Sequence, residues 1–196
     1  MNTDVSQETA EKTPKKSSSG TFFDILEMFV WSFFAVFVIF TFGFRLCRVE
    51  GPSMEETLHD KESILVTDFF YTPKQDDIII FHLTKPEADL QKTLVKRVIA
   101  TGGQQLEIDF YTGEIYVDGV LYADTHKTLK NPYTGEITGK YLQTGRLSLT
   151  VPEGKLFVMG DNRNNSRDSR STDIYFVDER CVLGKVFLRL SPWKLF

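Results

Sequence analysis

An uncharged run near the N-terminus constrains this chain more than any other feature. Residues Met28–Phe44 carry no charged side chain and are rich in phenylalanine. A helix needs about 20 mainly apolar residues to cross the hydrocarbon core of a bilayer. The apolar residues just before the run extend it to that length, and Arg45 and Arg48 close its far end. The sequence therefore predicts one transmembrane helix, which we place at residues 21–46.

Two alternatives to an anchor are a buried helix of a soluble protein and a cleaved secretory signal. So many phenylalanines are hard to keep soluble in a helix of this length. No small-x-small cleavage site follows the run, which is longer than the apolar region of about 7–15 residues in a signal peptide. An uncleaved anchor is the preferred interpretation.

Basic residues around the anchor indicate its orientation. Lys12, Lys15 and Lys16 precede the span, and two arginines follow it. Cytoplasmic flanks carry an excess of Lys and Arg. Residues 1–20 are polar and have too few apolar side chains to fold. We therefore expect them to form a disordered cytoplasmic tail, with residues 47–196 outside the cytoplasm. Membrane lipids are an expected partner of the protein.

Size and charge narrow the possible functions. The 196 residues leave room for the anchor and one globular domain. The formal net charge of -4 argues against a nucleic-acid-binding protein, which usually has a basic face. The only cysteines, Cys47 and Cys181, form neither a disulfide framework nor a zinc-ligand pattern.

After Cys47 the apolar residues occur in short, β-branched runs that are typical of strands. Within Glu114–Tyr122, an Asp-Gly pair predicts a hairpin with a two-residue turn. No long segment with helical periodicity follows the anchor, so the domain is predicted to be mainly β, with antiparallel strands. The other predicted strands are Ser63–Thr67, Ile78–Phe81, Leu94–Ile99, Leu147–Val151, Lys155–Met159 and Cys181–Leu190, the last bent at Gly184, and Lys127–Tyr141 is predicted to be an exposed loop.

A serine just beyond the anchor is a candidate nucleophile. It lies in the stretch Val49-Glu50-Gly51-Pro52-Ser53-Met54. Gly51 and Pro52 restrict the backbone path into Ser53, and Met54 offers an apolar wall beside it. Gly-Pro-Ser is also ordinary turn sequence, so this stretch alone does not decide between the two.

A Lys-Arg pair in a predicted strand supplies a candidate base. In Leu94–Ile99, side chains alternate between faces, so Lys96 shares a face with Leu94 and Val98, and Arg97 lies on the other. One of the two cations must lie on or near an apolar face. Burial of a lysine lowers its pKa, and a neutral amine can accept a proton from a serine. The alternative is that both cations reach water along an edge strand.

The third stretch is the polar segment Gly160–Arg170. Its Asp and Asn side chains can hold a turn by hydrogen-bonding the local backbone. Asp168 and Arg170 could pair, and Ser166 could orient a neighbouring amine or hydroxyl. A solvated loop with weak surface ion pairs is the alternative.

Together these stretches resemble the bacterial type I signal peptidases, which are membrane-bound serine peptidases with a serine–lysine dyad. The matching motifs occur in the family's order and are Pro52-Ser53-Met54 with Thr57-Leu58, Lys96-Arg97-Val98-Ile99, and Gly160-Asp161-Asn162-Arg163 with Ser166, Asp168, Ser169 and Arg170. The resemblance covers nearly everything from the span to the end of the chain. It implies an antiparallel β catalytic domain, in agreement with the strand pattern.

The resemblance also implies roles for these residues. Ser53 would be the nucleophile, and its backbone N–H would form part of an oxyanion hole. Lys96 would be the general base. Ser166 would hold the lysine, and Asp168 with Arg170 would brace the site. Shallow pockets for small substrate residues would be lined by Val49, Gly51, Met54, Leu58, Leu94 and Val95. The substrates would be exported preproteins, and no metal or cofactor is implied.

The chain departs from the family pattern at a few positions. Gly51 stands where some relatives have a serine that completes the oxyanion hole. Glu56 replaces a proline, and Ala100–Gln104 and Ser171–Asp173 replace segments of different composition. These departures put packing and substrate preference in doubt more than the chemistry, because Ser53 and Lys96 remain.

Two other functions compete with signal-peptide cleavage. One is a hydrolase that uses a histidine, with His59 as the candidate because it lies close to Ser53 in sequence, and with His82 and His126 as the remaining histidines. No recognisable motif surrounds any of them. The other is a non-catalytic, membrane-anchored assembly factor on the same fold that serves a narrow set of surface proteins. Retention of both dyad residues argues against it.

Overall fold

The computed structural model describes residues 18–55, 57–85, 90–123 and 145–196. The chain divides into two units, residues 1–41 and 42–196. Several sequence predictions lie outside the described residues, namely most of the tail, the Lys127–Tyr141 loop, Glu56 and His126.

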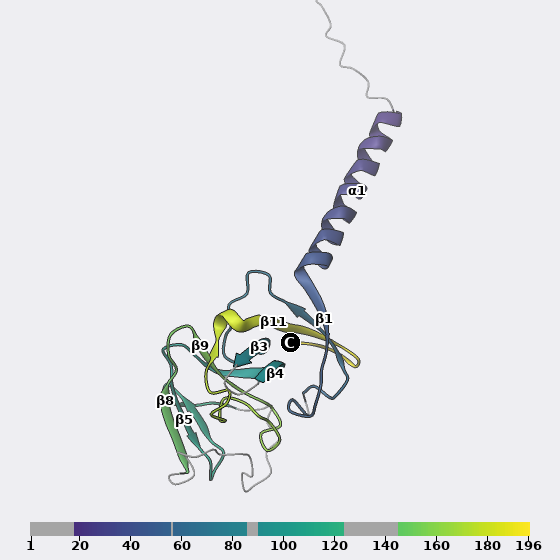
Figure 1. Ribbon diagram of the computed structural model, residues 1–196. Helices are drawn as coiled ribbons and strands as arrows, with labels where there is room; N and C mark the ends of the chain where they lie inside the picture. Colours follow the sequence, from purple (N-terminus) through teal and green to yellow (C-terminus); the bar gives the residue numbers. More distant parts are fainter. Residues whose placement is uncertain (1–17, 56, 86–89, 124–144) are drawn as a thin grey trace, which may run out of the picture. The chain divides into compact units, whose positions relative to one another are not determined.

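Among its described residues the first unit consists of the helix α1 (Ser18–Gly43), whose last two residues fall in the second unit (Figure 1). Within it, Phe22–Thr41 has a mean hydropathy of 2.1, and none of this window is buried. Twenty residues at about 1.5 Å rise per residue match the thickness of a bilayer core. The predicted apolar helix is therefore present. It begins at Ser18, inside the segment assigned to the tail, and it ends three residues before the predicted end of the anchor.

The second unit is built from antiparallel strands, as predicted, in two sheets (Figure 1). The larger sheet has the strand order β1-β2-β11-β3-β4-β9-β10, and β12 pairs with β11. Its strands are β1 (Phe44–Arg48), β2 (Ser63–Thr67), β3 (Ile78–Lys85), β4 (Leu90–Thr101), β9 (Lys155–Met159), β10 (Val177–Asp178), β11 (Val182–Leu190) and β12 (Trp193–Leu195).

The smaller sheet has the order β7-β6-β5-β8. Its strands are β5 (Gln105–Asp109), β6 (Ile115–Val117), β7 (Val120–Leu121) and β8 (Arg146–Thr150). The predicted hairpin is confirmed, because β6 and β7 pair and the two residues between them have positive φ angles, 52° at Asp118 and 76° at Gly119. Positive φ at both central residues is the requirement of a type I′ turn.

Several strand boundaries differ from the prediction: β3 and β4 are longer than Ile78–Phe81 and Leu94–Ile99, and β8 lies one residue earlier than Leu147–Val151. The last long strand differs as well. Cys181 belongs to a short 3-10 helix, Glu179–Cys181, and β11 begins one residue later. Asp178 caps that helix by accepting a hydrogen bond from the backbone N–H of Arg180, which favours a helical turn before the strand. The predicted bend at Gly184 coincides with a register shift against β3 between Val182 and Gly184.

Strand β3 is the centre of the hydrophobic core. Its apolar run is unbroken because both of its faces are covered. Ile79 and Phe81 belong to one buried cluster with Val98 and Val158. Ile78 and Ile80 belong to a second cluster, which lies against the segment that carries Ser53. The other buried members of this cluster are Val49, Met54, Leu58, Ile64, Val66 and Val186. A third cluster joins the smaller sheet to β4 and β9.

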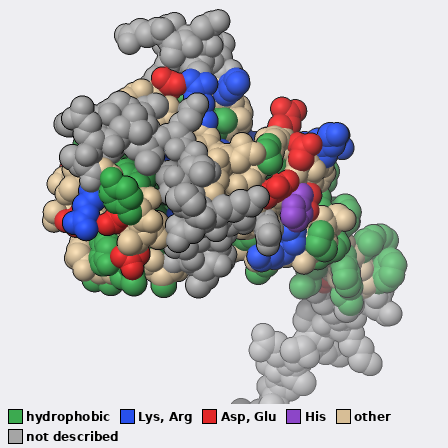
Figure 2. Space-filling model, turned by 90° about the horizontal axis from the view of Figure 1, so that it is seen from below, with side chains coloured by type: hydrophobic (Ala, Val, Ile, Leu, Met, Phe, Trp, Pro, Cys, Tyr) green, Lys and Arg blue, Asp and Glu red, His purple; other side chains and the backbone are tan. Residues whose placement is uncertain are grey.

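The surface of this unit carries both signs of charge. On the face shown in Figure 2, acidic and basic side chains of the described residues are intermingled. This distribution agrees with the mildly acidic composition of the chain.

Candidate active site

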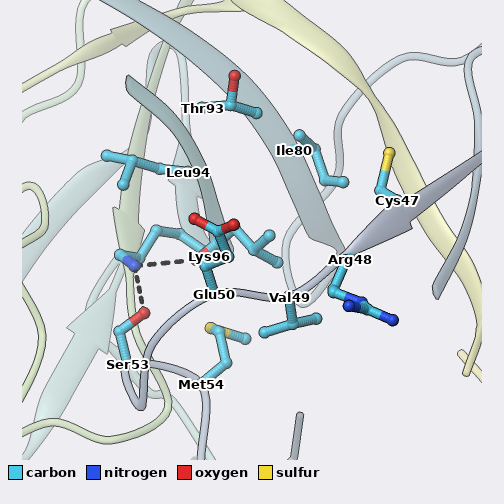
Figure 3. Close-up of a pocket in the computed structure, with 11 residues that line it drawn as sticks. Cys47, Arg48, Val49, Glu50, Ser53, Met54, Ile80, Thr93, Leu94 and Lys96 are labelled. Carbon is cyan, nitrogen blue, oxygen red and sulfur yellow. Dashed lines mark hydrogen bonds between the residues drawn. The ribbon is translucent and has the colours of Figure 1, made fainter. Parts of the chain in front are cut away.

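Ser53 and Lys96 are in direct contact. The Lys96 Nζ atom donates a hydrogen bond of 2.6 Å to Ser53 Oγ and one of 2.9 Å to the Val95 carbonyl (Figure 3). Ser53 comes from the turn that follows β1, and Lys96 comes from β4, 43 residues later. A central strand of the larger sheet thus holds the Lys96 amine, and a tight loop places the Ser53 hydroxyl against it.

Burial sets the electrostatics of this pair. Lys96 is only 2% exposed. Its burial lowers the pKa of the amine from 10.5 to about 8, because the charged form loses its hydration. The Asp168 and Asp161 carboxylates raise this pKa, and Arg170 lowers it. A substantial fraction of Lys96 is therefore neutral near pH 8 and can accept a proton.

Arg97, the other cation of the pair, is buried as well, at 3% exposed. Strand alternation predicted that one of the two would lie on an apolar face, and the structure buries both. The guanidinium forms a bidentate ion pair with Asp161, with Nε–Oδ1 and Nη2–Oδ2 distances of 2.9 and 2.7 Å. It also donates to the Asp76 carbonyl at 2.8 Å. This fork-to-fork geometry satisfies both charges away from water.

The Gly-Asp-Asn tripeptide after β9 holds the serine loop in place. Asp161 accepts a hydrogen bond of 2.6 Å from the Thr57 hydroxyl. Asn162 donates its backbone N–H to the Ser53 carbonyl at 3.1 Å and its side-chain amide to the Pro52 carbonyl at 3.0 Å. The loop that carries Ser53 is therefore fixed from both sides of this residue by residues more than 100 positions away.

Gly160 brings Ser53 and Ser166 together. A Cβ atom at this position would lie well inside van der Waals contact of the Ser53 carbonyl oxygen and of the Ser166 side chain. Only a residue without a side chain allows the two serine segments to approach this closely.

The end of the polar segment, Asp168–Arg170, is bound into the core. Asp168 and Arg170 are buried and form a bidentate ion pair, with both N–O distances 2.7 Å. Asp168 also accepts the Gly160 N–H at 3.0 Å, and Ser169 Oγ accepts the Val158 N–H at 2.9 Å. These contacts anchor the segment to β9, so it is not the solvated loop that was the alternative.

A cavity of about 280 Å³ opens beside the Ser53–Lys96 pair. Val49, Met54, Ile80, Leu94 and Val95 give it apolar walls (Figure 3). The remaining lining residues are Cys47, Arg48, Glu50, Ser53, Thr93 and Lys96. A small space with apolar walls next to the Ser53 hydroxyl is suited to small aliphatic side chains.

Comparison with known proteins identifies the family. Residues 22–193 match the family model described as signal peptidase, peptidase S26. The chain belongs to this family. It is a membrane-associated serine endopeptidase that cleaves signal peptides.

Individual relatives have the same description. The chain is 29% identical to Signal peptidase IB of Staphylococcus aureus over 175 residues, which cover 84% of this chain and 87% of the relative. It is 32% identical to the probable signal peptidase I-1 of Synechocystis over 151 residues, 74% of this chain and 69% of the relative. The crystal structure of a signal peptidase I from Enterococcus faecalis has a TM-score of 0.44 and 30% identity, and covers 59% of this chain and 97% of that chain.

The structure brings together most of the residues that the sequence of this signal peptidase singled out. Ser53, Lys96, Val49, Met54, Leu94 and Val95 all line one cavity. Two predicted pocket residues do not line it. Leu58 is fully buried in the core below the serine loop, because the chain turns inward after Met54. Gly51 serves the turn, with a φ of 86° and its N–H bonded to Asp60.

Ser166 and the described histidines do not make the contacts that their expected roles require. The hydrogen bonds of Lys96 Nζ within the described residues go to Ser53 and Val95, and Ser166 packs against Gly160 instead. His59 and His82 are exposed, and neither lines the cavity.

Sequence reasoning missed the residues that position Ser53. Asp161, Asn162 and Thr57 were recognised as parts of motifs, but no contact could be assigned to them. It also missed Arg48 and Glu50 on the cavity wall. The one sequence feature that pointed to these positioning contacts was the density of hydrogen-bonding side chains in Gly160–Arg170.

We predict that Gly160→Ala lowers kcat/KM for preprotein cleavage by on the order of 10²-fold, because the new methyl group must displace Ser53 or Ser166, and a shift of about 1 Å in a reacting group has that cost. Cleavage of one purified preprotein by full-length enzyme in micelles measures the effect. Gly43→Ala is the matched control, since nothing lies within 4 Å of its added Cβ. Equal activity of the two variants would show that the close approach at Gly160 is unimportant.

Proposed function

We propose that Ser53 is the nucleophile and Lys96 the general base with which this signal peptidase cuts exported preproteins. The 2.6 Å hydrogen bond between Lys96 Nζ and Ser53 Oγ carries the proposal. The distance is short enough for direct proton transfer, and the lowered pKa of Lys96 supplies the neutral amine that must accept the proton.

The reaction has two stages. Neutral Lys96 takes the Ser53 proton as Oγ attacks the scissile carbonyl carbon. The resulting ammonium then protonates the leaving amine, which is the new N-terminus of the mature protein, and the signal peptide remains esterified to Ser53. In the second stage Lys96 takes a proton from water, which attacks the ester, and Ser53 regains its proton as the signal peptide leaves.

The backbone N–H of Ser53 supports the charge that develops on the carbonyl oxygen. Among the described residues it makes no hydrogen bond, so it is available as a donor. Preorganised donors of this kind contribute because they need no rearrangement during the reaction. Asn162 fixes the carbonyl of the same residue, so the peptide units that flank Ser53 are held in one orientation.

Asp168, Arg170 and Ser166 support the dyad without taking part in proton transfer. The buried Asp168–Arg170 pair places a carboxylate and a guanidinium within electrostatic range of Lys96, where they shift its pKa in opposite directions. Ser166 lies close to Gly160, on the same side as the Ser53 carbonyl oxygen that a Gly160 side chain would also meet.

The substrate lies extended across the cavity. Strand β4 pairs with β9 only from Arg97 onward, so within the described residues its edge at Thr93–Lys96 has no neighbour on that side. An extended peptide can add to such an edge by main-chain hydrogen bonds. Small side chains at the first and third positions before the cut would then enter the apolar cavity.

A non-catalytic assembly factor is not favoured. The relatives described above are signal peptidases, and Lys96 Nζ lies within hydrogen-bond distance of Ser53 Oγ, as a dyad requires. The histidine mechanism with His59 as its candidate loses its support as well, because His59 and His82, the histidines among the described residues, lie outside the cavity.

We also propose that α1 anchors the enzyme in a lipid bilayer, with residues 1–20 in the cytoplasm and residues 47–196 outside. The apolar window of the helix and the lysines before it support this topology. The anchor would confine the enzyme to the plane in which membrane-inserted preproteins present their cleavage sites.

Substitutions at the dyad test the mechanism. Ser53→Ala, Lys96→Ala and Lys96→Arg should each lower the cleavage rate by on the order of 10⁴ to 10⁶. Arginine keeps the charge but stays protonated, so it cannot act as a base. Lys92→Arg, an exposed change in the same strand, is the matched control and should retain activity, as should His59→Ala and His82→Ala. A folded Lys96→Arg enzyme with near-normal turnover would exclude the serine–lysine mechanism.

Protease protection tests the topology. In sealed, right-side-out vesicles, added protease should remove the domain after Cys47 and spare an epitope placed in residues 1–17, because the bilayer shields the cytoplasmic side. Detergent should expose both. Protection of the large domain in intact vesicles would reverse the proposed orientation.

A further inference from the structure

The cavity wall next to Ser53 carries two opposite charges in a regular pattern. Along the extended segment 47–50, Val49 is buried and Cys47 half-buried, whereas Arg48 and Glu50 are exposed. All four residues line the cavity. The two apolar side chains therefore form its wall, and the two charged ones stand on the solvent side of the same wall.

Neither charge has an ion-pair partner among the residues that the structure describes. Within the described part of the chain, the side chains of Arg48 and Glu50 belong to no ion pair and no hydrogen bond. In the view of Figure 3, the Glu50 carboxylate lies toward the Ser53–Lys96 pair, and the Arg48 guanidinium lies on the far side of Val49. Glu50 is thus the charge nearer the cut.

An extended substrate presents its side chains with a matching repeat. Side chains alternate along a strand, so if the first and third residues before the cut point into the cavity, the second and fourth point outward. Outward residues are about 6.6 Å apart, at about 3.3 Å rise per residue. Arg48 and Glu50 are also two residues apart on an extended segment, so the two pairs can lie opposite one another.

We propose that Glu50 and Arg48 make the enzyme selective for the charge of these two outward-facing substrate residues. Glu50 favours a basic residue at the second position before the cut and disfavours an acidic one. Arg48 favours an acidic residue at the fourth position. The inference rests on the proposed function, because Ser53 fixes where the cut falls.

The preference is graded, because both charges face water. An exposed ion pair contributes up to about a fivefold difference in an equilibrium or rate, and salt weakens it. The apolar cavity decides whether a peptide is cut, and the charges rank the peptides that fit.

The test uses full-length enzyme in uncharged detergent, so that headgroup charge does not contribute. Peptides with alanine at the first and third positions carry Lys, Gln or Glu at the second. Wild-type kcat/KM should fall in the order Lys, Gln, Glu, with about a fivefold span that shrinks in about 0.5 M salt. Glu50→Gln should remove the ranking, and Glu50→Lys should reverse it. Glu107→Gln, the same change on the exposed face of β5, should leave the ranking intact.

A second peptide series varies the fourth position and pairs it with Arg48→Gln, which should abolish a preference for Glu over Lys. An unchanged ranking in Glu50→Gln, or no ranking in the wild-type enzyme, would overturn the inference. Ser53→Ala separates this failure from failure of the dyad. If Ser53→Ala is inactive and Glu50→Gln leaves the ranking of the peptides unchanged, only the proposed charge preference is wrong. If Ser53→Ala still cuts the peptides, the proposed mechanism is wrong.

Discussion

Burial of one lysine amine beside one serine hydroxyl is the constraint on which the rest of the site depends. An exposed lysine would remain charged at neutral pH and could not act as a base. The apolar strands around Lys96 remove the water that would stabilise the ammonium, and this lowers its pKa to about 8. The buried amine still needs hydrogen-bond partners, and the Ser53 hydroxyl and the Val95 carbonyl provide them.

Arg97 has the opposite requirement from its neighbour. A guanidinium does not lose its proton in a protein, so burial of Arg97 is tolerated only if an anion is buried with it. Asp161 is that anion, and through its hydrogen bond from the Thr57 hydroxyl it also links β4 to the loop that carries Ser53. The ion pair that permits an arginine in the core therefore also positions Ser53 relative to Lys96. Removal of either partner would leave an uncompensated buried charge, which costs about 3–5 kcal/mol.

Local patterns predicted the local features of the fold. Ser63–Thr67 and Lys155–Met159 are strands at the predicted bounds, and the Asp-Gly hairpin has the turn that its sequence requires. Alternation along β4 also placed Lys96 against apolar neighbours. These features depend on residues a few positions apart, and so a single sequence contains the information.

Features that depend on distant partners could not be predicted in this way. Burial of Arg97 depends on Asp161, 64 residues away, and the place of Asn162 depends on Pro52, 110 residues away. Leu58 was expected in the pocket because it follows the serine motif, but the turn after Met54 directs it into the core. Ser53 and Lys96 were chosen as a candidate dyad from the resemblance to a family. The contacts that hold these two residues in place could be found only in the structure.

The charge state of Lys96 is the quantity that tests this account most directly. Full-length enzyme with ¹³Cε-labelled lysine can be titrated by NMR in detergent, and Lys96→Gln assigns the resonance. The account predicts a midpoint of about 8 for Lys96, well below the ordinary 10.5. Because the neutral amine is the active form, log kcat/KM should rise with pH through the same midpoint. A Lys96 midpoint near 10.5 in the folded enzyme would contradict the account, because the amine would then be charged at the pH where the enzyme works.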